Sequence, residues 1–244
     1  MTINICIPGI SGKMGIEIAK LILLEKPNLN LLSGVVREKN KDNNKLSFLH
    51  DEIITTNLDQ AISKCDVCID FTRPDYSILV MQACVKYNKK LVIGTTGYNN
   101  AQIKAIELAS KDISILKASN MSIGINLCLK LVEKISSIIG DNSDIDIIEY
   151  HHKHKVDMPS GTSLSLESAI KKKLNSSKDI KHHCLRVGNV VGDHMVKFTL
   201  ENESIEVTHK SFDRKIFAEG AILSLKWIID KDKGLYGMND VLSL

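Results

Sequence analysis

The chain has 244 residues and an ordinary composition for a globular protein, with 43% hydrophobic and 25% charged residues. Its formal net charge of +3 is too small to indicate nucleic-acid binding, and no run of about 18 apolar residues predicts a membrane span. The first residues lack the basic segment of a signal peptide, and the six cysteines are scattered through apolar segments, so we expect reduced thiols and a cytoplasmic protein.

The chain begins with a predicted strand, a glycine turn and a helix. Residues 3–7 form a short apolar run, and glycines follow at positions 9, 12 and 15. Apolar residues then recur at helical spacing until Pro27. Glycines let a backbone approach a pyrophosphate, and the N-terminus of the helix offers N–H groups and a positive dipole end. The context favours dinucleotide binding, although a tight turn without a ligand has the same pattern.

The second predicted strand, residues 29–36, ends beside a basic residue. Many NAD-binding folds place an acidic residue here for the ribose 2′-hydroxyl, but this chain has Val36 and Arg37. A guanidinium can bind the oxygens of a 2′-phosphate in pairs, and Lys13 in the glycine turn adds a second positive charge. Unless both are solvated surface charges, these cations predict a preference for NADPH over NADH.

Strands and helices then alternate. Residues 38–57 are polar and predict a loop, strands are expected at 66–71, 90–93 and 113–117, and helices lie between them. This order predicts a doubly wound parallel sheet, in which ligands bind at the carboxyl ends of the strands. Cys65 and Cys68 form a lone C-x-x-C pair, from which we predict neither a redox nor a metal site.

The pattern changes after residue 121. A long helix at 122–139 precedes a strand at 144–149 that alternates polar and apolar residues. A helix at 164–174 and strands at 183–190, 194–200 and 204–210 follow, and a last helix covers 213–230. Consecutive strands predict a second, α+β domain with an open mixed, largely antiparallel sheet.

One segment is unusually rich in titratable residues. Three histidines and two lysines occupy residues 151–155, and Ser160 to Thr162 precede a helix. The density indicates an anionic ligand or proton transfer, and the helix start indicates an anion site. A surface cluster is the plain alternative. Adjacent histidines of a strand face opposite ways, so only His152 and His154 share a face, and we predict no metal. His194 and His209 are interpreted as structural.

With these motifs the chain resembles the dihydrodipicolinate reductase (4-hydroxy-tetrahydrodipicolinate reductase) family. The motifs span nearly the whole chain, and the most specific is Glu149-x-His151-His152-x-x-Lys155-x-Asp157-x-Pro159-Ser160-Gly161-Thr162. The others are Gly9-x-x-Gly12-x-Met14-Gly15, Asp70-Phe71-Thr72, Gly94-Thr95-Thr96-Gly97, Ser119-Asn120-Met121-Ser122, Phe217-x-x-Gly220-Ala221 and Gly234-Leu235-Tyr236-x-Met238.

The resemblance implies a Rossmann-like dinucleotide-binding domain at 1–121 and 213–244. It also implies a substrate-binding and tetramerisation domain at 122–212. By position, His151 is the expected catalytic acid/base and Lys155 the expected proton donor, while His152, Ser160, Gly161 and Thr162 are expected to bind substrate. The expected cofactor-binding residues are Gly9, Ile10, Ser11, Gly12, Lys13, Met14, Arg37, Phe71, Thr72, Gly94, Thr95, Thr96, Ala118, Ser119, Asn120 and Met121.

The activity that the resemblance implies is the NAD(P)H-dependent reduction of 4-hydroxy-tetrahydrodipicolinate to tetrahydrodipicolinate with loss of water, in lysine and diaminopimelate biosynthesis. The substrate would be a small cyclic dicarboxylate, NADPH the preferred cofactor with NADH possible, and the assembly a homotetramer. Lys13 and Val36 depart from many relatives, which have Arg and an acidic residue there. Two alternatives stay open: another two-domain NAD(P)-dependent dehydrogenase, or a non-catalytic NADPH-binding protein. The residues do not decide whether His151 or Lys155 donates the proton.

Overall fold

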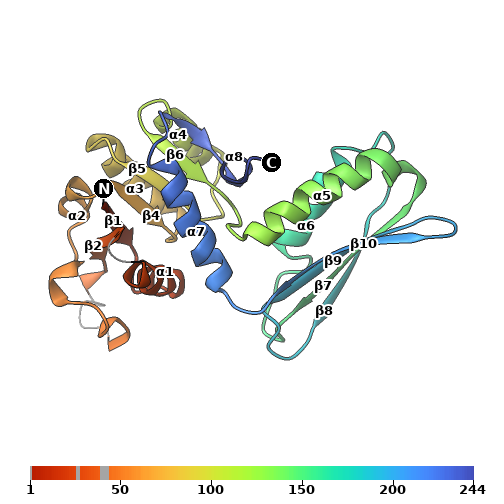
Figure 1. Cartoon of the computed structure of the whole chain (residues 1–244), viewed down its shortest axis with the longest axis horizontal. Helices are drawn as coiled ribbons and strands as arrows, with labels where there is room; N and C mark the ends of the chain where they lie inside the picture. The colour runs from red at the N-terminus through yellow and green to blue at the C-terminus, as the bar shows by residue number, and fades with distance from the viewer. Residues whose placement is uncertain (1, 26–27, 39–43) are drawn as a thin grey trace. The chain divides into compact units, whose positions relative to one another are not determined.

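The computed structural model describes residues 2–25, 28–38 and 44–244, and the chain divides into two compact units (Figure 1). Unit 1 combines the residues up to Met121 with Phe217–Ser243, and unit 2 comprises Ser122–Ile216 together with Leu244. Pro27, where the first helix was expected to stop, and residues 39–43 of the predicted loop lie outside the described residues.

Unit 1 is built on a parallel sheet of seven strands. Its order is β11-β6-β5-β4-β1-β2-β3, and every pairing described is parallel. The central strands are β1 (Ile3–Pro8), β2 (Leu29–Val35), β4 (Val67–Asp70), β5 (Lys90–Ile93) and β6 (Ser114–Lys117). The strand order reverses between β1 and β4, the switch point at which doubly wound sheets bind ligands. The predicted Rossmann-like sheet is confirmed.

Helices cover both faces of this sheet because successive side chains of each strand point to opposite sides. Ile5 and Ile7 of β1 pack in one core with α1 (Lys13–Leu24) and α7 (Lys215–Ile228). Cys6, between them, packs in a second core with α2 (Leu58–Lys64), α3 (Pro74–Lys86) and α4 (Asn100–Ala109). The buried cysteines therefore take the place of small apolar residues, as expected.

The two edges of the sheet were not predicted. β3 (Ile54–Thr55) pairs with β2 inside the expected loop, which also contains 3₁₀ turns at Asn44–Leu46 and Asp51–Ile53. β11 (Gly234–Tyr236) returns from the end of the chain to pair with β6, and α8 (Met238–Leu242) follows it. These strands have two and three residues, too few to show a period of two.

Unit 2 contains the predicted mixed sheet, in the order β10-β9-β7-β8. β7 (Asp144–His151) runs antiparallel to β9 (Gly192–Thr199) and parallel to β8 (Lys181–Arg186), and β10 (Ser204–Ser211) is antiparallel to β9. The long helix α5 (Ile123–Ile139) ends in a 3₁₀ turn at Gly140–Asn142, and α6 (Gly161–Lys171) precedes β8.

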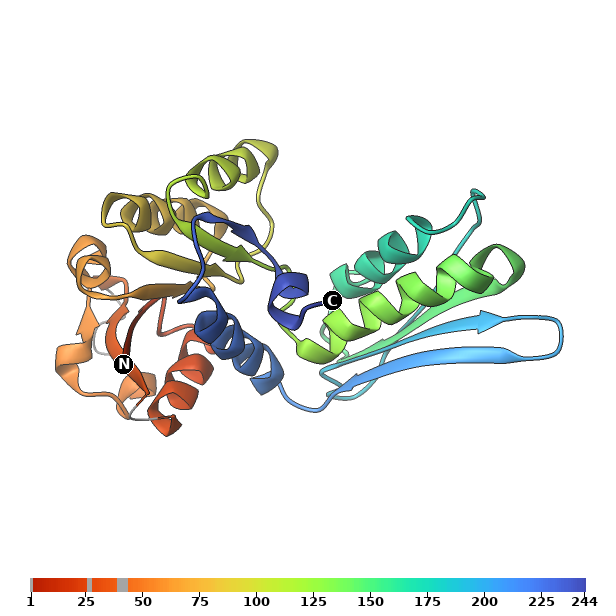
Figure 2. The ribbon, with the colours of Figure 1, turned by 45° about the horizontal axis from the view of Figure 1, so that its top comes forward.

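One face of the second sheet is covered by both helices of its unit (Figure 2). Ile145 and Ile147 of β7 and Val196 and Phe198 of β9 pack against Val132 of α5 and against α6. The next residue on this face of β7 is Glu149 and the last is His151, so the core side of the strand ends in titratable groups.

Among the described residues, no helix has both the length and the apolar character needed to span a membrane.

Some predicted bounds shifted. The strand expected at 183–190 ends at Arg186, because the chain turns at Gly188, which has a φ of +50°. The strand expected at 194–200 begins two residues earlier, at Gly192, and ends at Thr199. α6 begins at Gly161 rather than Leu164, and α7 begins at Lys215 rather than Asp213.

Candidate active site

The glycine turn of unit 1 has a backbone conformation and close contacts that require glycine. Gly9 has a φ of +72°, and a Cβ built there would lie 2.8 Å from Cγ2 of Thr72. A Cβ at Gly15 would lie 2.7 Å from Cα of Ile10, so this glycine lets α1 pack close to the turn. Gly12 caps α1 without a side-chain hydrogen bond. The cradle therefore suits a phosphate that approaches the N–H groups at the start of the helix.

A cavity of about 270 Å³ lies at the carboxyl ends of β1, β2 and β4, at the switch point of the sheet. The residues that line it are Gly9, Ser11, Gly12, Val35, Val36, Arg37, Phe71, Thr72, Arg73 and Tyr76. Six of these ten were predicted to bind the cofactor, and Val35, Val36, Arg73 and Tyr76 were not. Arg73 gives the cavity a second guanidinium beside Arg37, in a place that suits a phosphate.

Other predicted cofactor positions have different surroundings. Ile10 and Met121 are buried in the first core, so only their backbone is available to a ligand. Lys13, at the start of α1, is exposed, and Met14 packs partly into the same core. Gly94 follows β5, and a Cβ there would overlap the ring of Phe71 at 2.1 Å, so the two predicted segments depend on each other.

Asp70, which the sequence motif contained but to which we gave no role, organises this edge. Its buried carboxylate accepts hydrogen bonds from the backbone N–H and the hydroxyl of Thr72, at 3.0 and 2.5 Å, from Thr95 at 3.0 Å, and from Ser77. Burial raises the pKa of Asp70, although these hydrogen bonds oppose the rise. The carboxylate thereby joins the ends of β4 and β5, where the predicted cofactor residues lie.

In unit 2, the carboxylate of Glu149 lies at the centre of the titratable cluster and is fully buried. Oε2 accepts hydrogen bonds from the backbone N–H of Ser160 at 3.0 Å and from the hydroxyl of Ser163 at 2.5 Å. Oε1 accepts one from Nη2 of Arg186 at 3.0 Å. Burial would raise the pKa of Glu149, but these hydrogen bonds outweigh it and lower the pKa to about 2. The carboxylate is therefore ionised at neutral pH.

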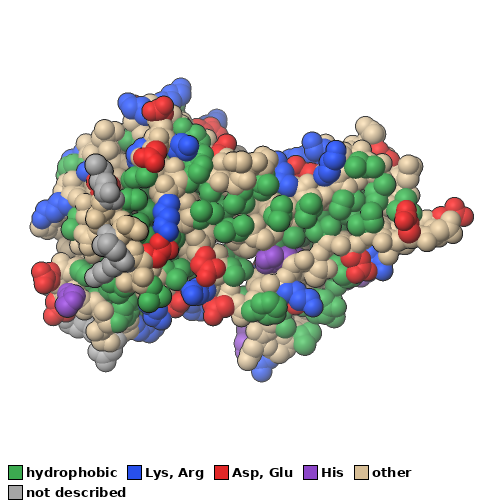
Figure 3. Space-filling model, viewed as in Figure 1, with side chains coloured by type: hydrophobic (Ala, Val, Ile, Leu, Met, Phe, Trp, Pro, Cys, Tyr) green, Lys and Arg blue, Asp and Glu red, His purple; other side chains and the backbone are tan. Residues whose placement is uncertain are grey.

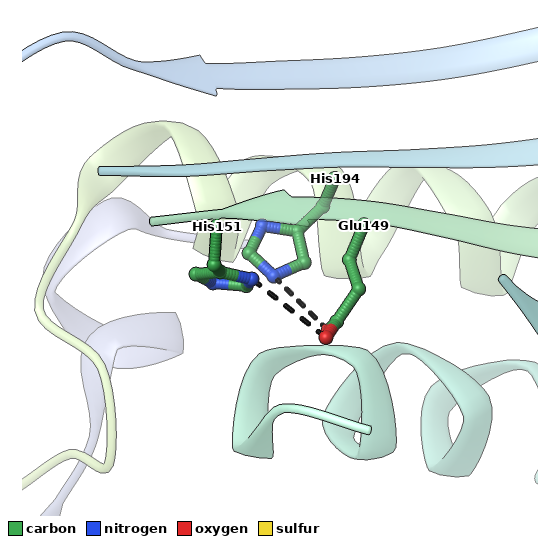
Figure 4. A group of neighbouring side chains, drawn as sticks. All are labelled: Glu149, His151 and His194. Carbon is green, nitrogen blue, oxygen red and sulfur yellow. Dashed lines mark ion pairs between the residues drawn. The ribbon is translucent and has the colours of Figure 1, made fainter. Parts of the chain in front are cut away.

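Two histidines approach this carboxylate from neighbouring strands (Figure 4). Nδ1 of His151 lies 3.7 Å from Oε1 of Glu149, and Nε2 of His194 lies 4.0 Å from Oε2. The two rings meet edge to face, with centroids 5.1 Å apart. Burial lowers the pKa of both, that of His194 to about 4, and Glu149 partly offsets this for each ring. Both imidazoles are therefore mainly neutral at pH 7, and His151 is the one that changes charge more readily.

Lys155 and the start of α6 complete the cluster. Nζ of Lys155 pairs with the carboxylate of Asp157 at 2.8 Å. Ser160 caps α6, since its hydroxyl accepts from the backbone N–H of Ser163 at 3.2 Å. A Cβ at Gly161 would meet no heavy atom within 4 Å, so the space in front of the helix start is open there. The arrangement combines a positive charge, an anion-binding helix start and a titratable imidazole.

The carboxylate of Glu149 and the two histidine rings beside it are groups that commonly bind metal ions. Glu149, His151 and His194 are buried, and each offers a ligand atom within 4.8 Å of the others. Glu149 already accepts three hydrogen bonds. Arg186 and Lys155 place positive charge close to these side chains, because both lower the pKa of His151. These positive charges oppose a bound cation, so the arrangement suits proton transfer and anion binding better.

Comparison with known proteins agrees with this geometry. A model of the N-terminal part of dihydrodipicolinate reductase matches residues 3–121, and a model of its C-terminal part matches residues 124–242. The chain belongs to the dihydrodipicolinate reductase family. It therefore has the NAD(P)-binding fold of a reductase, as predicted.

Relatives in the dihydrodipicolinate reductase family match over nearly their whole length. The 4-hydroxy-tetrahydrodipicolinate reductase of Buchnera aphidicola subsp. Baizongia pistaciae is 39% identical, over 100% of this chain and 98% of the relative. That of Nitrosospira multiformis is 37% identical over the same shares. The structure of dipicolinate-bound dihydrodipicolinate reductase from Paenisporosarcina sp. TG-14 has a TM-score of 0.84 and 25% identity, and covers 98% of this chain and 99% of its own.

The structure brings together only part of what the family motif predicted. Hydrogen bonds join Ser160 to Glu149, Glu149 to Arg186, and Arg186 to the backbone carbonyl of Lys155. His151 lies 3.7 Å from Glu149, and Gly161 follows Ser160 as the first residue of α6. His152 instead lies in the turn after β7, its ring 6.3 Å from that of His154. Sequence reasoning missed Glu149, Arg186 and His194 as members of the site. Strand register was the signal that could have found them, since His151 is opposite Arg186 and Glu149 is opposite His194.

Proposed function

We propose that the chain is a cytoplasmic 4-hydroxy-tetrahydrodipicolinate reductase. It reduces 4-hydroxy-tetrahydrodipicolinate to tetrahydrodipicolinate with NADPH and loss of water, in lysine and diaminopimelate biosynthesis. The observation that carries the proposal is the site of unit 2, where a buried imidazole and a lysine accompany an open helix start that suits a carboxylate. A dipicolinate-bound relative supports a cyclic dicarboxylate as the substrate.

In this proposal, some residues of the site bind the substrate and others supply the proton. The N–H groups at the start of α6 and the ammonium of Lys155 bind carboxylates of the substrate. His152, Ser160 and Thr162 complete this substrate site in the proposal. A bound dicarboxylate adds negative charge near His151 and raises its pKa, so substrate binding itself favours the protonated imidazole. His151 or Lys155 then releases the proton that accompanies reduction.

The cavity of unit 1 suits the phosphate-bearing part of a nicotinamide dinucleotide, which would supply the hydride when bound. The glycine cradle suits its pyrophosphate, and Arg37 and Arg73 suit a 2′-phosphate. The segments 94–96 and 118–121, after β5 and β6, complete the proposed cofactor site at the same edge of the sheet.

Cofactor oxidation with synthase-generated 4-hydroxy-tetrahydrodipicolinate tests the proposed function. We expect turnover with NADPH, which is measured as the loss of the absorbance of the reduced nicotinamide. Turnover only with a different substrate would identify another two-domain dehydrogenase. Cofactor binding without turnover of any such substrate would instead identify a non-catalytic binding protein, and either result would contradict the proposal.

NADPH is expected to bind more tightly than NADH. Replacing Arg37 with alanine removes charge-assisted hydrogen bonds to the 2′-phosphate, each about 1.5–3 kcal/mol, and should weaken NADPH binding about tenfold or more. NADH lacks this phosphate, so its affinity should stay unchanged. Calorimetry with both cofactors measures the difference, and Lys64→Ala, which removes an exposed charge of α2, is the control. Equal affinities of the wild type for both cofactors would remove the argument from Arg37.

The assembly is proposed to be a homotetramer formed through unit 2. The face of its sheet opposite the helices carries apolar side chains in register, with Ile148 opposite Met195 and Tyr150 opposite Leu185. Tyr150 and Leu185 are more than a third exposed. Hydrophobic side chains also gather over α5 (Figure 3), among them the exposed Ile123, Leu127 and Leu131. Sedimentation equilibrium should give four times the mass of the chain, and a monomer or dimer would contradict the proposal.

A further inference from the structure

The ion pair between Glu149 and Arg186 is the least exposed salt bridge between a carboxylate and an arginine or lysine among the described residues. Its side chains are 1% and 11% exposed, and Oε1 of Glu149 lies 3.0 Å from Nη2 of Arg186. Burying two charges requires compensation from further hydrogen bonds, and both groups have them. The partners of those hydrogen bonds are the elements of the proposed active site.

Arg186 holds the loop that carries Lys155. Its Nε donates to the backbone carbonyl of Lys155 at 3.2 Å, and its Nη2 donates to the carbonyl of Asp157 at 2.5 Å. These carbonyls flank the ion pair between the side chains of Lys155 and Asp157. A planar guanidinium holds its N–H donors in fixed relative directions, so it sets both the position and the orientation of the loop.

Glu149 holds the other two parts of the site. Through Oε2 it fixes the backbone N–H of Ser160 and the hydroxyl of Ser163, and so the start of α6. Through Oε1 it lies 3.7 Å from Nδ1 of His151 and presents a negative charge to that ring. One carboxylate therefore connects His151, the anion-binding helix start and, by way of Arg186, the loop of Lys155.

We propose that Glu149 and Arg186 are positioning residues that hold His151 and Lys155 in place and, by their opposite charges, govern the protonation of His151. The inference rests on the proposed function and assigns to this pair a role that the sequence motif gave to neither residue. Neither side chain needs to contact the substrate for this role.

The charges around His151 act in opposite directions. Burial lowers its pKa, Glu149 on the same strand and Asp157 in the loop raise it, and Lys155 in the loop and Arg186 on β8 lower it. On β9, His194 stays neutral from about pH 5 upward, because burial and the nearby His151 hold its pKa at about 4. Loss of the charge of Glu149 should therefore lower the pKa of His151, and loss of the charge of Arg186 should raise it.

Two substitutions that break the same ion pair test this inference. Glu149→Gln and Arg186→Gln would each loosen the loop and lower kcat. A purely structural role gives both variants the same effect, whereas the charges predict opposite shifts. If protonated His151 donates the proton, kcat/KM falls above its pKa. This alkaline limb should move about one pH unit lower in Glu149→Gln and by a smaller amount in the opposite direction in Arg186→Gln.

The titration of His151 is also followed directly, by NMR of protein labelled in its histidines. The signal is assigned by its absence in His151→Gln. Glu167→Gln, which removes a glutamate paired with His182 at 3.0 Å on the same unit, is the matched control and should leave the titration unchanged. If either single variant does not fold, the double variant Glu149→Gln/Arg186→Gln removes both charges. His151 should then titrate below the wild-type value, because the pKa-raising effect of Glu149 is larger than the pKa-lowering effect of Arg186.

Shifts of His151 in the same direction in both single variants, or no shift in either, would overturn the inference. So would a pKa of His151 in the double variant that lies above the wild-type value. The NMR titration needs no turnover, so the inference can be tested even if the wild type fails to reduce the proposed substrate. That failure would contradict the proposed function alone.

Discussion

Replacing His151 with glutamine is expected to lower the turnover of 4-hydroxy-tetrahydrodipicolinate about a hundredfold, and replacing Lys155 with methionine is expected to do the same. General acid catalysis by one side chain typically contributes a factor of about 10² to 10⁴. Both residues belong to the cluster around Glu149, and glutamine and methionine keep much of the original volume without a titratable group. The measurement is the steady-state rate over a range of pH with NADPH at saturation.

The neighbouring residues provide matched controls. His154→Gln and Lys153→Met change the same residue types in the same segment, but both side chains are exposed. These controls should keep nearly the wild-type rate. The pH profiles then separate the two proposed donors, because the alkaline limb should disappear in the variant that lacks the donor. Wild-type rates in both His151→Gln and Lys155→Met would contradict the assignment of the site.

Cofactor binding and the fold of unit 1 were accessible from the sequence because their signals are local. Gly9, Gly12 and Gly15 follow a strand and open a helix, and alternating strands and helices predict the parallel sheet. The edge strands β3 and β11 were not accessible. Each is specified by pairing with a neighbour far along the chain rather than by its own few residues.

The proposed proton-transfer site could be predicted only in part, for the same reason. The density of histidine and lysine drew attention to the segment, and the family motif predicted roles for His151 and Lys155, but the partners of Glu149 depend on strand register. Arg186 is 37 residues away along the chain, and only the parallel pairing of β7 and β8 places it beside His151. His194 was interpreted as structural because its strand showed no chemical signal. Its ring lies instead against His151, and its Nε2 lies 3.2 Å from the hydroxyl of Ser160.

Replacing Gly220 with alanine is expected to destabilise unit 1 severely. Gly220 lies in α7, and a Cβ there would lie 1.7 Å from the carbonyl oxygen of Met121 and 2.7 Å from its carbonyl carbon. A backbone carbonyl cannot turn aside as a flexible side chain can, so the helix must move away from the segment after β6. Overpacking typically costs 1–3 kcal/mol and occasionally more, and we expect a loss of about 3 kcal/mol or more here.

The single tryptophan makes this loss measurable in the correct unit. Trp227 lies on α7 in unit 1, so its fluorescence reports unfolding of unit 1 in urea. A lower midpoint in Gly220→Ala is the expected result. An unchanged midpoint would show that α7 does not need this close approach to Met121.

Gly161 is also a glycine of a family motif, but Gly161→Ala should weaken substrate binding without lowering the stability of the fold. Its Cβ would meet no heavy atom within 4 Å, and alanine favours a helix more than glycine, so the urea midpoint should not fall. The added methyl group would occupy the open space before α6, where a substrate carboxylate is proposed to approach the N–H groups. KM for the substrate should therefore rise about tenfold while NADPH affinity stays unchanged. An unchanged KM would mean that no carboxylate binds at the start of α6, because the fold itself gives no reason for glycine there.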